Sequence, residues 1–141
     1  CLIQGPGVPA NRVIDDPVGS IDILATAADL CGIETAGNHG QSWRHLWEQT
    51  QSRDFALSEY EVDAIRSAVD MDLMTVRSRR YRMSTDLKTD TGELYDMQED
   101  PDEMVNLFDD QGYAAVRKEH MDMIRSRPAD QIPVSPRVGW H

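Results

Sequence analysis

The chain has 141 residues, of which 40% are apolar, and this length and composition suit one compact globular domain. With 25 acidic against 14 basic side chains, the net charge is −11, which argues against nucleic-acid binding because phosphate contacts need a basic face. No apolar run approaches the roughly 20 residues of a membrane span. The two cysteines, Cys1 and Cys31, form no CxxC pair and no disulfide framework, so the cellular compartment stays undecided.

The first 34 residues are expected to hold one strand and one helix. In "CLIQGPGVPANR" we expect Leu2-Ile3 to be a short buried strand before a Gly-Pro-Gly turn, and the abrupt start without methionine indicates a fragment of a longer protein. The following helix is expected to be capped by Ser20, to carry Asp22 in its first turn and to end at Gly32. Its apolar residues fall on two faces, which predicts burial on both sides.

Alternating patterns dominate the middle of the chain. A Gly/Asn loop and a helical turn with Trp43, Leu46 and Trp47 occupy residues 35–49. Strands are predicted in residues 53–60, in two parts of 72–87 on either side of a tight turn, and in 93–97, while 62–71 are left irregular. Short strands joined by tight turns predict an antiparallel sheet.

The last predicted element is an amphipathic helix in "YAAVRKEHMDMIRSRP". Asp109 or Asp110 is available as its cap and Pro128 ends it, after which residues 128–141 are extended. One face of this helix is largely apolar and consists of Tyr113, Val116, His120, Met123 and Ile124. We expect His120 on this face to be a core residue with satisfied hydrogen bonds.

The acidic stretch "GELYDMQEDPDEMVNL" does not match an EF-hand calcium loop. A loop that starts at Asp96 lacks the required glycine, and one that starts at Asp86 has Lys88 at a ligand position. We expect Asp100-Pro101 to open a turn, and Asp102 and Glu103 to begin a helical turn. The histidines lack zinc spacing, and no catalytic triad, phosphate loop or paired catalytic carboxylates are found. The residues by themselves therefore predict an α+β piece with no catalytic and no metal-binding residues of its own.

Two features of the sequence are candidate binding sites. The first is a cluster of four arginines in one short stretch: Arg77, Arg79, Arg80 and Arg82. Such a cluster could hold an anion such as sulfate, phosphate or carboxylate. The alternative, which we prefer, is that the arginines belong to a solvated hairpin. His39 lies in a glycine-flanked loop and is the histidine of interest, although an ordinary loop residue is the simpler interpretation.

Four segments in order resemble the C-terminal part of the type I sulfatases of the alkaline phosphatase superfamily. They are residues 2–33, "GQSWRHLW", "LMTVRSRRYRM" and "GELYDMQEDPDEMVNL", which matches the family's Glu-Leu-Tyr-Asp-Leu, Asp-Pro, Glu, Asn-Leu signature. The resemblance covers roughly residues 2–127. It implies an α+β fold with a small, about four-stranded antiparallel sheet and a packed C-terminal helix, preceded by the last strand and helix of an α/β catalytic domain.

The resemblance also implies a domain division: 1–34 as the end of the catalytic domain, 35–54 as a connection, 55–127 as the C-terminal subdomain and 128–141 as a tail. Sulfatases use a formylglycine and a divalent metal, usually calcium, and neither motif can be carried onto this chain. Cys1 and Cys31 lack the Cys-x-Pro-x-Arg context. We therefore expect no cofactor here, and we expect the parent protein to supply both. His39, Arg77 and Arg79 are the candidates for contact with a sulfate-ester substrate.

Two alternatives stay open beside a catalytically silent sulfatase fragment. One is the same part of a phosphonate or phosphate monoester hydrolase of the superfamily, and the other is a non-enzymatic interaction module that offers an edge strand or a helix. The expected partner is the missing N-terminal catalytic domain. Formation of a homo-oligomer is left open, as is the compartment.

Overall fold

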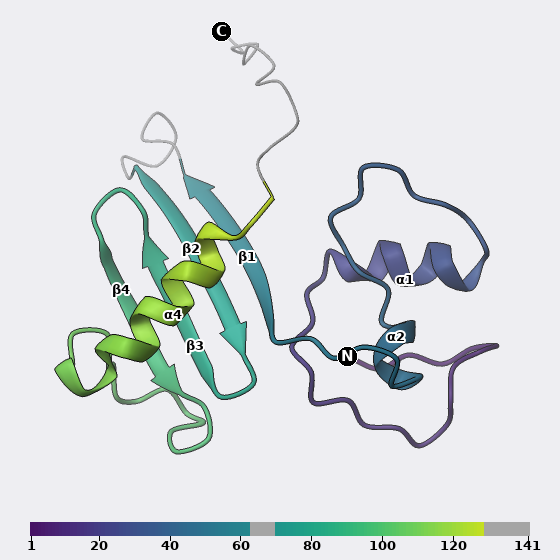
Figure 1. The fold of residues 1–141 in the computed structure, drawn as a ribbon, viewed down its shortest axis with the longest axis horizontal. Helices are drawn as coiled ribbons and strands as arrows, with labels where there is room; N and C mark the ends of the chain where they lie inside the picture. The colour runs from purple at the N-terminus through teal and green to yellow at the C-terminus, as the bar shows by residue number, and fades with distance from the viewer. Residues whose placement is uncertain (63–69, 129–141) are drawn as a thin grey trace, which may run out of the picture.

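A computed structural model of the chain describes residues 1–62 and 70–128, which form two parts that lie side by side (Figure 1). The N-terminal part holds helix α1 (Asp22–Leu30) and the short helix α2 (Arg44–Trp47) among irregular segments. The second part, the sheet part, holds four strands and helix α4 (Ala114–Arg125). Within the residues that are described, no helix is both long and apolar enough to span a bilayer.

The sheet is a meander in which each strand pairs antiparallel with the one before it, as the sequence predicts. The strands are β1 (Phe55–Val62), β2 (Met71–Ser78), β3 (Tyr81–Asp86) and β4 (Thr91–Asp96), in that spatial order. The stretch 62–71, predicted to be irregular, has its two ends in β1 and β2, and residues 63–69 lie outside the described residues.

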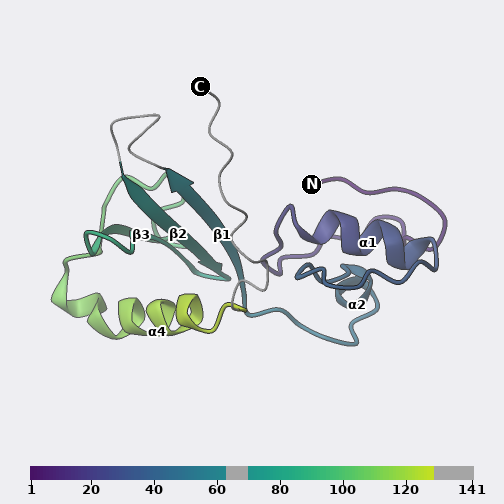
Figure 2. The same ribbon diagram turned by 90° about the horizontal axis from the view of Figure 1, so that it is seen from above.

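Helix α4 covers one face of the sheet, and the apolar core lies between them (Figure 2). Period-two alternation along the strands sends one set of side chains into this core, which Phe108 and Ile124 close from the helix side; it consists of Met74, Val76, Met83, Leu94, Phe108 and Ile124. His120 on α4 is 1% exposed, with Nδ1 2.8 Å from the carbonyl of Val116 and Nε2 3.0 Å from the hydroxyl of Ser78. The prediction of a satisfied core histidine is confirmed.

The outer edge of β4 is closed by the chain that follows it. Asn106 accepts a hydrogen bond from the amide of Leu94 at 3.0 Å and donates to the carbonyl of Gly92 at 3.1 Å, and the amide of Leu107 donates to the carbonyl of Leu94 at 2.8 Å. An uncovered edge strand offers unpaired amides and carbonyls to other chains. The Asn-Leu end of the acidic stretch therefore caps this edge of the sheet.

The N-terminal part is organised around buried polar groups of α1. The hydroxyl of Thr26 donates to the carbonyl of Asp22 at 2.7 Å and accepts from the amide of Trp43 at 3.0 Å, which ties α1 to the start of α2. Trp43 and Trp47 are buried, as expected from their helical spacing. Gly32 ends α1 with a positive φ of 69°, the left-handed conformation predicted for that position.

Three local predictions are wrong. Leu2-Ile3 is irregular and Leu2 is 95% exposed, because no described segment offers these residues a strand to pair with. Ser20 does not cap α1: the N-cap is Ile21, which makes no side-chain capping hydrogen bond, and the Asp22 carboxylate accepts the amide of Gly19. The predicted helical turn after Pro101 is a non-helical turn, in which Glu103 has a φ of 56°.

The two helix ends near the C-terminus agree with prediction. Asp110 caps the 3-10 turn η1 (Gln111–Tyr113) that leads into α4, and its carboxylate accepts from the amide of Gly112 at 2.7 Å. Helix α4 stops at Arg125, three residues before Pro128. The predicted extended tail falls almost wholly on residues 129–141, outside the described residues.

Candidate functional site

The β2–β3 hairpin carries the four arginines that the sequence singles out, and it brings two of them face to face. Arg77 on β2 and Arg82 on β3 are cross-strand partners, so their side chains leave the same face of the sheet, opposite α4. Two like charges directly opposite each other destabilise a sheet unless anions compensate them. The environment of each guanidinium therefore decides what the hairpin can bind.

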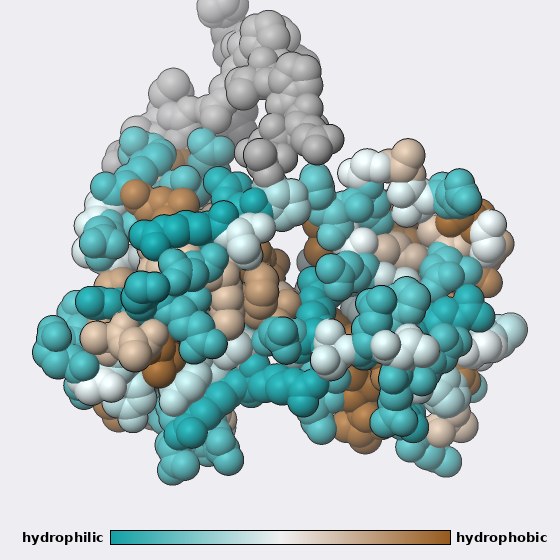
Figure 3. Space-filling model, in the orientation of Figure 1, coloured by the Kyte–Doolittle hydropathy of each residue, from teal (hydrophilic) through white to brown (hydrophobic). Residues whose placement is uncertain are grey.

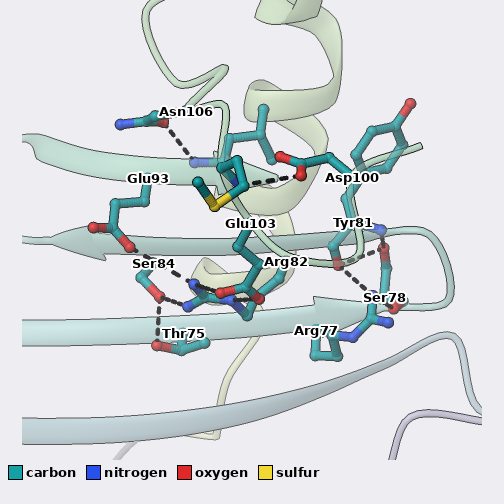
Figure 4. A network of polar contacts seen from close by, with 12 residues as sticks. Thr75, Arg77, Ser78, Tyr81, Arg82, Ser84, Glu93, Asp100, Glu103 and Asn106 are labelled. Carbon is teal, nitrogen blue, oxygen red and sulfur yellow. Dashed lines mark hydrogen bonds and ion pairs between the residues drawn. The ribbon is translucent and has the colours of Figure 1, made fainter. Parts of the chain in front are cut away.

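Arg82 is compensated by acids from two segments (Figure 4). Its guanidinium forms a two-bonded ion pair with Glu103 at 2.5 and 2.6 Å, lies 3.7 Å from Glu93 and donates to the hydroxyl of Ser84 at 3.0 Å. The hydrogen bond with Glu103 is the main reason that the pKa of Arg82 is raised. The hydroxyl of Ser84 lies 2.9 Å from that of Thr75, which extends the polar network across three strands.

The loop that delivers Glu103 is held in a specific shape. The carboxylate of Asp100 accepts the amides of Met104 at 3.1 Å and Val105 at 2.8 Å, and the amide of Glu103 donates to the carbonyl of Asp100 at 3.1 Å. Glu103 has a left-handed backbone, which is unfavourable for a residue with a side chain. These bonds hold that conformation, so the acids of this stretch fix a turn and neutralise Arg82.

Arg80 is also neutralised, by the last residue of β4. Its guanidinium binds both oxygens of Asp96, at 2.6 Å for the shortest contact, and lies 5.2 Å from the centre of the Tyr81 ring. Asp96 is 2% exposed, and the hydrogen bonds from Arg80 lower the pKa of its carboxyl despite the burial.

Arg77 differs from the other three arginines. It is half-buried, and among the described residues no carboxylate lies within ion-pair distance of it. Its Nη1 donates to the carbonyls of Ser78 at 2.8 Å and Tyr81 at 3.2 Å, so that it braces the hairpin turn. Burial lowers the pKa of Arg77, the charge of Glu103 opposes that shift, and the charge of Arg82 adds to it.

Arg79 lies at the junction between the two parts of the molecule. Its guanidinium donates to the carboxylate of Asp16 at 2.7 Å, and the same oxygen accepts the amide of Arg53 at 2.9 Å. The bond from Arg53, together with Arg79, lowers the pKa of Asp16. Arg79 also lines an open polar cavity of about 550 Å³ with Arg12, Asp15, Gln49 and Ser52. The predicted binding arginine is thus engaged in linking the hairpin to the N-terminal part.

His39 belongs to a different segment of the chain from the hairpin arginines. It is exposed on the loop that leads to α2, where the neighbouring Asn38 accepts the amide of Gly40 at 2.9 Å. Among the described residues, no hydrogen bond joins His39 to Arg77 or Arg79. The contacts within the described residues therefore leave the grouping of these three residues into one site as a prediction.

Asp22 is the strongest polar centre that sequence reasoning missed. Its carboxylate is 0% exposed and accepts the amides of Gly19 at 2.7 Å and Gln41 at 2.9 Å, besides an ion pair with the guanidinium of Arg53. Burial opposes ionisation, but these donors outweigh it and hold the pKa of Asp22 below its usual value. The sequence shows only an acidic residue in a first helical turn, and its partners lie far along the chain.

A second, largely apolar cavity of about 360 Å³ lies between the irregular start of the chain and α2. Apolar side chains from both segments line it, among them Leu2, Val8, Val13, Trp43 and Trp47.

Metal binding finds no support in the described parts of the chain, where no group of three or more His, Cys, Asp or Glu side chains could hold an ion.

The chain matches the protein family described as "N-sulphoglucosamine sulphohydrolase, C-terminal" over residues 2–129. The Delta 4,5-hexuronate-2-O-sulfatase of Bacteroides thetaiotaomicron is 30% identical over 134 residues, which make up 87% of this chain and 27% of that protein. A solved structure of a 2-O GAG sulfatase has a TM-score of 0.73 at 30% identity, and the match covers 86% of this chain and 27% of that one.

The phosphonate monoester hydrolase of Agrobacterium radiobacter shares the fold, with a TM-score of 0.62 at 24% identity over 74% of this chain and 23% of that one. The chain thus spans about a quarter of the length of the relatives that it matches. Because the family match extends over nearly the whole chain, the chain belongs to the N-sulphoglucosamine sulphohydrolase C-terminal family, whose members are C-terminal domains of sulfatases.

Proposed function

We propose that this chain is the C-terminal part of a longer sulfatase that hydrolyses sulfate esters of carbohydrates. The observation that carries the proposal is the family match over residues 2–129, together with 30% identity to a hexuronate-2-O-sulfatase of which the chain spans 27%. The names of this relative and of the 2-O GAG sulfatase favour a sulfated uronic acid as the substrate class. The chain would complete the fold of the longer sulfatase and form one wall of its substrate pocket.

The reacting groups belong, in this proposal, to the polypeptide that precedes residue 1. The acids of the hairpin region are engaged with arginines, and the described residues offer no metal-binding group. Formylglycine would supply the nucleophile, and a divalent metal would neutralise charge on the sulfate oxygens. The 141-residue chain by itself is therefore expected to be catalytically silent.

Arg77 and His39 are the proposed contacts between this chain and the substrate. Arg77 is half-buried and forms no ion pair within the described residues, and only its Nη1 is given to backbone carbonyls, which favours an anionic group such as a sulfate or a sugar carboxylate at its other N–H groups. His39 is exposed and free to approach a ligand. Arg79 is the weaker candidate, because Asp16 already pairs with its guanidinium.

The test compares ester classes with the complete protein that contains this chain. We expect 4-nitrophenyl sulfate and an unsaturated 2-O-sulfated disaccharide to be hydrolysed, and 4-nitrophenyl phosphate and a phenylphosphonate monoester to be turned over at least about tenfold more slowly. Faster hydrolysis of the phosphonate than of the sulfates would support the alternative function, phosphonate monoester hydrolysis, which a protein of the same fold carries out. Absence of turnover with every ester would favour an interaction module.

The proposed role of Arg77 is tested separately. In the complete protein, Arg77→Met is expected to raise KM by about fivefold or more while kcat changes less, since a lost binding contact weakens ground state and transition state alike. Arg125→Met, on the exposed side of α4, removes the same charge elsewhere and is expected to leave both constants unchanged. Equal kinetics for the two variants would assign Arg77 to the hairpin turn alone.

A further inference from the structure

The open polar cavity of about 550 Å³, here called the junction cavity, lies where the two parts of the molecule meet. Three segments line it: residues 12–16 of the irregular start, residues 46 and 49–52 at the end of α2 and after it, and Arg79 at the turn of the β2–β3 hairpin. Figure 3 shows hydrophilic surface between the two parts. The volume of the cavity lies within the range of sites that take small ligands.

The junction cavity has hydrogen-bond donors that the protein itself leaves unused. Arg79 donates from Nη2 to Asp16 at 2.7 Å, and within the described residues its other N–H groups have no partner. Arg12 is exposed and forms neither a hydrogen bond nor an ion pair with any residue that the structure describes. Gln51 and Ser52 add a side-chain amide and a hydroxyl to the same walls. Asp16 thus fixes the guanidinium of Arg79 at the cavity without consuming its donors.

Unused acceptors line the same cavity. The carboxylate of Asp15 is exposed and accepts no hydrogen bond from the described part of the chain, and Gln49 and Gln51 each contribute a side-chain carbonyl oxygen. Two arginines and two aspartates are among the lining residues, so the described walls carry no net charge. The cavity therefore combines donors and acceptors in a site that attracts neither cations nor anions strongly.

This combination of groups decides which class of ligand fits. A bare anion such as sulfate needs donors alone, and the charge of Asp15 would repel it. A divalent cation needs a shell of oxygen ligands, and the described residues offer no group of side chains that could hold one. A nucleotide base needs a stacking surface, and no aromatic side chain of the described residues lines this cavity. A sugar unit has hydroxyl groups that both donate and accept, and its C–H groups suit the apolar side chains of Val13 and Leu46.

We propose that the junction cavity binds an unsulfated sugar unit of a carbohydrate chain, with Arg12, Arg79 and Gln51 donating to its oxygens and Asp15 accepting from its hydroxyls. The choice of a carbohydrate over a peptide, which also mixes donors and acceptors, rests on the proposed function, in which the longer protein acts on sulfated carbohydrates. The sugar unit in the cavity is then a different one from the unit whose ester reacts. Two contacts along one carbohydrate chain make the second contact intramolecular, which raises the affinity for long substrates over short ones.

The experiment measures binding to the complete protein by isothermal titration calorimetry. The probe is a tetrasaccharide of alternating glucuronic acid and N-acetylglucosamine without sulfate, so no ester is hydrolysed during the titration. We expect Arg12→Met to raise the Kd of this probe by about fivefold or more, because it removes a charged donor from the cavity. Arg125→Met on α4 is the matched control and is expected to leave the Kd unchanged. Equal Kd values for the two variants, or no binding of the probe to the unsubstituted protein, would overturn the proposal.

A second pair of variants tests an uncharged contact. Gln51→Ala is expected to raise the Kd of the tetrasaccharide by about threefold, because it removes one neutral hydrogen-bonding group. Gln98→Ala, in the sheet part, is the matched control; both glutamines are exposed, so both variants are expected to fold. Equal Kd values for these two variants would contradict the proposal. Inorganic sulfate, added at constant ionic strength, is expected not to compete with the tetrasaccharide, and displacement of the sugar by sulfate would overturn the proposal in favour of an anion site.

Sulfate-ester hydrolysis is assayed on the same unsubstituted protein, which separates this proposal from the proposed function. An active sulfatase in which Arg12→Met leaves tetrasaccharide binding unchanged contradicts only the sugar site in the junction cavity. A protein that hydrolyses no sulfate ester, but whose tetrasaccharide binding is weakened by Arg12→Met, contradicts only the proposed function.

Discussion

The carboxylate of Asp22 is completely buried and forms an ion pair with Arg53, which lies 31 positions further along the chain. Arg53 also donates from its Nε to the carbonyl of Phe55, the first residue of β1, at 3.0 Å. This pair therefore connects α1 to the start of the sheet. Because the two amides of Gly19 and Gln41 saturate the carboxylate as well, it is a buried charge with full compensation.

We predict that Asp22→Asn destabilises the chain by about 3 kcal/mol or more, since it leaves Arg53 without its counter-charge and turns an amide NH₂ toward donors. The measurement is urea unfolding monitored by tryptophan fluorescence, which reports on the buried Trp43 and Trp47. Asp29→Asn is the control on the same helix and is expected to cost less than about 1 kcal/mol, because its ion pair is partly exposed. Equal losses of unfolding free energy in the two variants would contradict the view that burial makes the Asp22 ion pair the stronger one.

Stability is predicted to fall in acid. The pKa values of Asp22 and Asp96 are lowered in the folded chain below the ordinary value of 3.8, so the folded state binds fewer protons than the unfolded state near that pH. Their contribution is present above pH 4 and is lost as the pH falls through their folded-state pKa values. Urea midpoints measured from pH 7 to pH 3 should decline below pH 4, and the decline should be shallower in Asp96→Asn.

Gly92→Ala is predicted to destabilise the sheet part by about 1–3 kcal/mol, the usual cost of overpacking. A methyl group at this position of β4 would lie 2.5 Å from the Phe108 ring and 2.6 Å from the carbonyl of Ser84. Gly5→Ala is the matched control, because nothing lies within 4 Å of the corresponding position there. Thermal unfolding should separate the two variants, and an unchanged melting temperature for Gly92→Ala would show that both Phe108 and the backbone at Ser84 can move aside.

The edge of β4 gives a graded prediction. Asn106→Ala removes the acceptor for the amides of Leu94 and Phe108 and the donor to Gly92, and it should cost about 1–2 kcal/mol. Asn106→Asp retains the acceptor and loses only the donor, so it should cost less. Urea unfolding ranks the variants, and light scattering should show faster aggregation of the alanine variant because its edge is open. Loss of stability in Asp as large as in Ala would contradict this assignment.

Elements with a strong period were predictable from the sequence, and isolated short ones were not. The strands β1–β4 and helix α4 carry alternation or helical spacing over six to twelve residues, and they form where expected. Leu2-Ile3 is too short to form a ladder without a neighbouring strand. The turn at Glu103 was misassigned because Pro101 and two acids suit a helix start, whereas the carboxylate of Asp100 selects a left-handed turn.

The candidate site was predictable in composition but not in pairing. Clustered arginines are visible in the sequence, yet the acids that neutralise three of them lie 16, 21 and 63 positions away, on β4, in the following loop and in the N-terminal part. Only the fold brings these groups together. Within the described residues, Arg77 is the hairpin arginine that forms no ion pair, and this can be seen only once the partners of the other three are known.

The meander order of the sheet has a consequence for how the chain is made. Every strand pairs with the strand synthesised just before it, so each ladder is available as soon as the later strand leaves the ribosome. Asn106 and Leu107 follow the end of β4 by only ten and eleven residues and close its edge before α4 is complete. We expect the interval in which a growing chain displays an unpaired β4 edge to be brief, which limits misassembly between neighbouring nascent chains.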